Sequence, residues 1–161
     1  MSVRFCALAF LLTSFFLACD KGLEPPPPAP TIAGKIYFSG ARPPCDSVRI
    51  LAVVLIEAAP PYIPQDLING FLNNSILPFI LEPCSFRDTT YKFTVVPDKH
   101  YNYLGVAQNY DTNLYNDWHV VGFSHDENDS ARAFELLPGE AISGVDIHVR
   151  FDSLPRQPFV Q

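Results

Sequence analysis

The chain has 161 residues, a formal net charge of −6, and 17 acidic against 11 basic side chains. Such an acidic balance leaves no basic footprint for nucleic acid, so no nucleic-acid partner is expected. The hydrophobic content of 48% and the aromatic content of 13% indicate one packed domain and exclude a disordered chain.

Residues 1–18 have the pattern of an export signal. The apolar run Phe5 to Ala18 follows Arg4 and is 14 residues long, whereas a membrane-spanning helix needs roughly 20. Its end, Phe16-Leu17-Ala18-Cys19, resembles the lipobox of bacterial lipoproteins. The resemblance implies that the Cys19 thiol carries a diacylglycerol, that cleavage falls just before it, and that this lipid is the membrane contact of an exported protein. Whether the inner or the outer bacterial membrane holds it stays open.

Two other interpretations of this segment remain: an ordinary secretory signal cleaved further along, and an uncleaved anchor. All three place the rest of the chain outside the cytoplasm. Residues 19–30 then form a tether, because Pro25 to Pro28 and Pro30 favour an extended, semi-rigid polyproline II conformation. Its mechanical role is to hold a folded domain away from the bilayer.

Two cysteines, Cys45 and Cys84, remain beyond the signal and the lipid site. In an oxidising compartment such a pair favours a disulfide. The alternative is two buried free thiols, because sequence alone does not show whether the two Cα atoms approach within bonding range.

Residues 31–152 show the alternation of an all-β domain, and residues 153–161 form a C-terminal tail. About seven short strands separated by Pro, Gly, Asn and Asp turns predict an antiparallel β-sandwich. The expected strands cover residues 32–39, 48–56, 89–96, 101–109, 118–124, 131–137 and 145–151. The exception is a long insertion, in which residues 65–73 favour a short helix packed on a sheet edge or face.

The opening segment Thr31 to Phe38, the segment Tyr91 to Tyr103 and the closing Ile142 to Ile147 resemble carboxypeptidase-regulatory-like and transthyretin-like domains. Those families open on an "I-x-G-x-V-x-F" strand and contain a "Y-x-F-x-x-x-P-x-G-x-Y" hairpin. Lys99-His100 stands where the hairpin commonly has glycine. The resemblance implies a prealbumin-like or immunoglobulin-like sandwich and no particular activity.

The aromatic residues Trp118, Tyr110 and Tyr115 are the candidate ligand-binding set, because aromatic faces stack on sugar rings and anchor protein partners. The alternative is core packing around Trp118, which is the usual role of aromatic residues in strands.

The same region carries the candidate metal ligands Asp111, Asn113 and Asp117, whose hard oxygens suit calcium. Acidic residues are also good turn formers, so an ordinary turn is the competing interpretation. No cofactor is expected.

No catalytic residues are assigned, because the chain contains no His-Glu-x-x-His and no Gly-x-Ser-x-Gly motif. The sequence therefore favours a lipid-anchored, non-catalytic β-sandwich of the cell envelope, serving as an interaction or structural module for an envelope protein or glycan. A carbohydrate-binding module is the first alternative. A transthyretin-like hydrolase is the second, and it requires two histidines and an arginine in one cleft.

Overall fold

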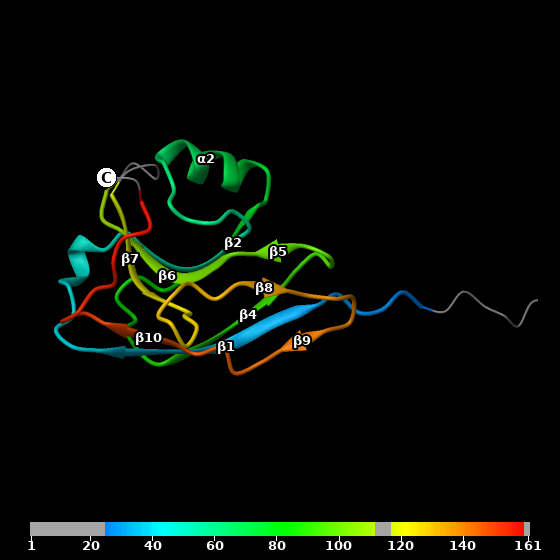
Figure 1. Ribbon diagram of the computed structural model, residues 1–161. Helices are drawn as coiled ribbons and strands as arrows, with labels where there is room; N and C mark the ends of the chain where they lie inside the picture. The colour runs from blue at the N-terminus through cyan, green and yellow to red at the C-terminus, as the bar shows by residue number, and fades with distance from the viewer. Residues whose placement is uncertain (1–24, 112–116, 160–161) are drawn as a thin grey trace, which may run out of the picture.

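The computed structural model describes residues 25–111 and 117–159. They form two four-stranded sheets packed face to face, a two-stranded ribbon and one α-helix (Figure 1). The predicted all-β, sandwich-like fold is thus confirmed. The first sheet contains β1 (Thr31–Ser39), β4 (Thr89–Thr94), β9 (Ala141–Ile142) and β10 (Ile147–Arg150). The second contains β2 (Ile50–Ile56), β3 (Ile76–Leu81), β6 (Tyr103–Asn109) and β7 (Trp118–Phe123), and the ribbon pairs β5 (His100–Tyr101) with β8 (Phe134–Glu135).

The first sheet, with the order β10-β1-β4, is not purely antiparallel as predicted. β1 pairs antiparallel with β4 but parallel with both β9 and β10. These two short strands lie along one edge of β1, and the chain bulges away between them. Gly34 stands opposite the bulge, where an added Cβ would lie 1.8 Å from the carbonyl oxygen of Val145. The glycine therefore lets the closing segment cross against β1.

In the second sheet, with the order β3-β2-β6-β7, the central strands β2 and β6 are buried on both faces. Leu51, Val53 and Leu55 of β2 face the first sheet, while Ala52 and Val54 face the opposite side. The near-continuous apolar sequence of β2 follows from this double burial, as its sequence predicted. The main core lies between the sheets, and a second, smaller apolar cluster lies outside β2, β6 and β7.

Ten strands occur in the described residues, three more than predicted. β9 is one of them. Another is β3, which lies at a sheet edge with Pro78 opposite Val54, a position where a missing N–H is tolerated. The third arises because the strand predicted over residues 101–109 is divided at Asn102 into β5 and β6. The Asn102 side chain donates to the carbonyl oxygen of Glu57 at 2.6 Å and fixes this break.

The predicted helix is present as α2 (Pro64–Leu72), and it lies on the outer side of the second sheet (Figure 1). Pro64 occupies its first turn, where a missing N–H costs nothing. The Asp66 carboxylate accepts a hydrogen bond from the Ile63 N–H at 3.0 Å. These two features define where the helix begins.

The last residues of the predicted tether, from Pro28 on, are already hydrogen-bonded to the domain. The carbonyl oxygen of Pro28 accepts a hydrogen bond from the Gly139 N–H at 2.8 Å, and that of Pro30 accepts one from the Val95 N–H at 2.9 Å. The tether leaves at one end of the sandwich, and the 3₁₀ turn η1 (Cys45–Ser47) lies at the other (Figure 1). The domain therefore has a proximal end, at the tether, and a distal end, at η1.

Candidate functional site

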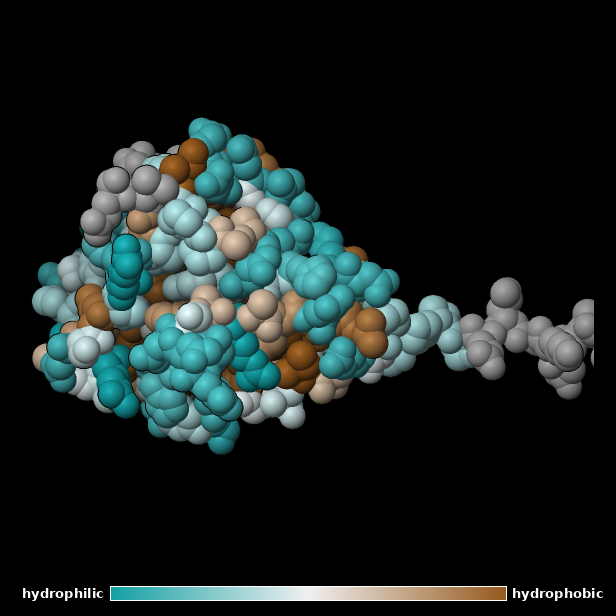
Figure 2. Space-filling model, viewed as in Figure 1, coloured by the Kyte–Doolittle hydropathy of each residue, from teal (hydrophilic) through white to brown (hydrophobic). Residues whose placement is uncertain are grey.

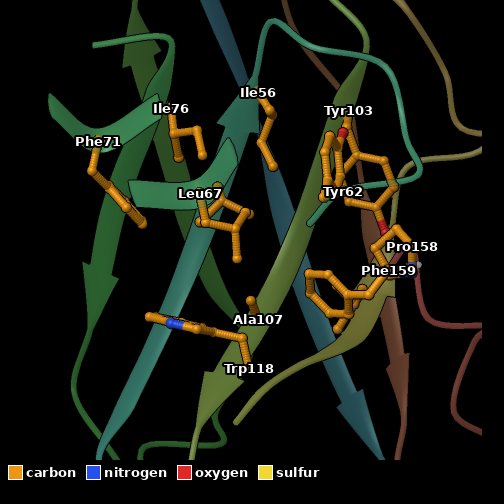
Figure 3. A pocket seen from close by; sticks show the side chains of 12 residues that line it. Ile56, Tyr62, Leu67, Phe71, Ile76, Tyr103, Ala107, Trp118, Pro158 and Phe159 are labelled. Carbon is orange, nitrogen blue, oxygen red and sulfur yellow. The ribbon is translucent and has the colours of Figure 1, made fainter. Parts of the chain in front are cut away.

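An apolar hollow lies between α2 and the outer face of the second sheet. Leu67 and Phe71 reach it from α2, Trp118 and Ala107 come from the sheet, and Phe159 comes from the C-terminal segment (Figure 3). The remaining lining residues are apolar or aromatic as well: Val54, Ile56, Tyr62, Ile76, Tyr103, Val120 and Pro158. We call this space the outer hollow.

The outer hollow is small and presents no polar surface of its own. Its volume is about 30 Å³, whereas pockets for drug-sized ligands measure roughly 300–1,000 Å³. The Tyr62 hydroxyl is turned to the carbonyl oxygen of Ala58, to which it donates at 3.0 Å. Burial raises the pKa of Tyr62 and of Tyr103, so both phenols stay neutral. The space fits the tip of one aliphatic side chain.

Exposed apolar side chains surround the helix beside this hollow. Ile63 is 46% exposed, Phe71 36% and Leu72 78%. Figure 2 shows apolar surface over α2 within a largely hydrophilic face. Leu72 therefore projects into solvent and does not pack on the sheet, although the helix as a whole was predicted to pack there. We call Ile63, Phe71 and Leu72 the α2 patch.

The C-terminal segment closes one side of the outer hollow instead of forming a free tail. Tyr62 pairs with Phe159 in a parallel bridge. The Gln157 side chain accepts from the Val120 N–H at 2.8 Å and donates to the Val120 carbonyl oxygen at 3.0 Å. One primary amide thus covers the outer edge of β7, which limits pairing with other chains.

The predicted aromatic set is divided between the two faces of the second sheet. Trp118 packs with the outer apolar cluster, whereas Tyr110 packs against the main core. The Tyr110 hydroxyl donates to Gln108 at 2.6 Å. Tyr115 lies outside the described residues. Trp118 and Tyr110 do not form one stacking platform.

The predicted metal ligands are only partly described. Asn113 lies outside the described residues. Asp117 lies 2.9 Å from His119 Nε2, so this imidazole engages one of its carboxylate oxygens. In residues 25–111 and 117–159, no group of three His, Cys, Asp or Glu side chains is placed to hold a metal ion.

The two cysteines predicted to pair are brought together as free thiols. Cys84 Sγ lies 3.0 Å from the carbonyl oxygen of Cys45. A hydrogen bond with the Cys45 side chain, followed by burial and nearby negative charge, raises the pKa of the Cys84 thiol to about 11. The disulfide itself stays a prediction, and Cys19 lies outside the described residues.

His100 and His119 lie apart from the other histidines: His100 is 3.5 Å from Glu135, and His119 is beside Asp117. His148, whose ring stacks on Tyr37, lines a second hollow together with His125 and Arg150. This hollow holds two histidines and an arginine, the combination that the hydrolase alternative requires. The sequence did not group these residues, because β7 and β10 meet only through the packing of the two sheets.

Two contributors to the outer hollow, Tyr62 and Phe159, were also missed from the sequence. The only available signal was their aromatic character, in segments without regular periodicity.

No family model matches this chain, and no curated protein or solved structure is significantly similar to it. Within the described part of the chain, no helix has the length and apolarity needed to cross a membrane.

Proposed function

We propose that this protein is a lipid-anchored, non-catalytic interaction module of the bacterial cell envelope, and that it binds a protein partner through the outer hollow and the α2 patch. The observation that carries the proposal is a wholly apolar hollow of about 30 Å³ beside exposed apolar residues on one helix. A partner inserts the tip of one aliphatic side chain and covers the α2 patch.

Size and polarity favour a protein over a glycan or a lipid chain. Sugar hydroxyls need hydrogen-bonding partners, and an unpaired hydroxyl buried in an apolar site costs about 1–3 kcal/mol. A hollow of about 30 Å³ holds little more than two water-sized spheres, so it accepts neither a sugar ring nor an acyl chain. Interface centres, in contrast, combine apolar anchors with tight packing.

The test places a photo-cross-linking amino acid at Phe71 of the full chain in its native cells, with the same residue at Lys92 as the control. Lys92 is exposed on β4, in the other sheet. The proposal expects one discrete envelope-protein adduct from position 71 and none from position 92. Leu72→Asp should abolish the adduct, whereas Leu137→Asp, at another exposed apolar residue, should not.

Absence of a discrete adduct at position 71, or equal labelling from position 92, would refute the binding surface. Anchoring has a separate test, mass spectrometry of the mature N-terminus. We expect an acylated Cys19, and an unmodified N-terminus further along the chain would overturn the lipid anchor while leaving the binding surface untouched.

A further inference from the structure

A second hollow lies where the edge strands of the two sheets meet. β7 and β10 pack together there, and Gly122 lets them approach closely. A Cβ at Gly122 would lie 2.9 Å from the Val149 side chain and 3.1 Å from the His148 carbonyl oxygen. The hollow beside this seam has a volume of about 520 Å³. That volume suits a small molecule, so this space differs in kind from the outer hollow.

Three basic side chains line this seam hollow: His125 from the loop after β7, and His148 and Arg150 from β10. His148 and Arg150 alternate with buried residues along the strand, so both project to the same, solvent-facing side. The His148 ring is held against Tyr37, with ring centroids 5.0 Å apart and an interplanar angle of 14°. In a chain with only 11 lysines and arginines, the seam hollow thus brings one guanidinium and two imidazoles together, and all three groups can donate hydrogen bonds.

Two neighbouring acids are engaged outside the hollow, and a third lies beside His125. Asp152 accepts a hydrogen bond from the Ala41 N–H at 3.0 Å, and Asp146 accepts one from the Lys35 N–H at 2.9 Å. Asp129, the one carboxylate in the lining, lies 3.4 Å from His125 Nδ1 and is 91% exposed. In the described part of the chain, no carboxylate lies within ion-pair distance of Arg150. Its guanidinium fork keeps its donors available for an oxyanion.

We propose that the seam hollow is a binding site for a small oxyanion, a phosphate or carboxylate group held by Arg150 and the two imidazoles. Phe123 and Leu154 form the apolar part of its wall, which suits an organic body attached to the anionic group. The site is independent of the α2 patch and of the lipid anchor.

The experiment titrates the full chain with inorganic phosphate in one arm and benzoate in the other, at constant ionic strength. Binding is followed by calorimetry and by the NMR signals of the histidine rings. We expect the signals of His125 and His148 to shift, with those of His100 and His119 as internal controls that do not. Arg150→Gln should weaken binding roughly tenfold or more, because a charge-assisted hydrogen bond is lost. Arg49→Gln, at an exposed arginine outside the hollow, should leave binding unchanged.

The arm that binds identifies the ligand as a phosphate or a carboxylate, and either result supports the site. Failure of both anions to bind overturns it. Equal weakening by the two arginine variants, or equal shifts of all four histidines, also overturns it, because general charge attraction would then explain the binding. Should Arg150→Gln fail to fold, His125→Gln in the exposed loop replaces it and is expected to weaken binding in the same direction.

Discussion

Oxidation of Cys45 and Cys84 should strongly stabilise the domain. The two residues are 39 positions apart, and the Sγ of one already contacts the backbone of the other at 3.0 Å. Between them the chain forms β2, α2 and β3, which supply one edge of the second sheet and part of the outer hollow. A bond here would close that entire segment into a loop in the unfolded state.

The size of the effect follows from the loop length. Closing about 40 residues removes unfolded-state entropy worth about 4 kcal/mol in the chain-entropy model. For a domain of this size, that corresponds to roughly 10–20 °C in melting temperature. Cys84 lies at φ 72°, a region that few residues other than glycine occupy, so the local backbone is already held in an uncommon conformation.

The assay compares urea unfolding of the oxidised full chain, the same chain under reductant, and the Cys45→Ser/Cys84→Ser variant. The oxidised form should show the higher midpoint, while the reduced form and the variant should agree with each other. Peptide mapping without reductant should recover a linked Cys45–Cys84 pair. Equal midpoints for the oxidised and reduced chains, or recovery of both cysteines as free thiols after oxidation, would refute the reasoning.

Three further predictions follow from single residues. Reduced Cys84 should alkylate about two orders of magnitude more slowly at pH 8 than an ordinary exposed thiol, because its pKa of about 11 leaves little thiolate. Cys45→Ala removes the Cys45 thiol, whose hydrogen bond is the largest cause of the raised pKa, so it should accelerate this alkylation; equal rates would contradict the side-chain interaction between the two cysteines. Gly34→Ala should destabilise by about 3 kcal/mol or more, since its Cβ would meet a backbone oxygen at 1.8 Å, and an unchanged unfolding midpoint would contradict that packing. A glycan array should show no binding that Trp118→Ala removes, and a glycan lost in that variant would favour the carbohydrate alternative instead.

Local patterning was enough to predict most of the strands and the helix. The alternation over Thr31–Ser39 and the double burial of β2 are both present in the structure. β3 was missed because Pro78 argues against a central strand and does not distinguish an edge strand from a loop. The parallel pairing of β1 with β9 and β10 was also missed, because strand direction depends on chain connections that periodicity does not encode.

The sites were harder to predict than the strands, because they are assembled by contacts between distant segments. Trp118 and Tyr110 are close in sequence, yet they pack on opposite faces of one sheet. His125 and Arg150 are far apart in sequence, yet they line one hollow. Tyr62 and Phe159 meet through a single bridge. Residue type marked these side chains as capable of binding, but only the packing of the two sheets decides which of them act together.

Because Pro28 and Pro30 are hydrogen-bonded to the domain, the part of the tether that remains free is short. With Cys19 acylated as proposed, only residues 20–27 separate the lipid from the first fixed residue, and they span at most about 30 Å when fully extended. That distance is close to the thickness of the hydrocarbon core of one bilayer. The domain would therefore stay within about 30 Å of its own membrane, so it is suited to binding partners in or close to that membrane and cannot reach structures far from it.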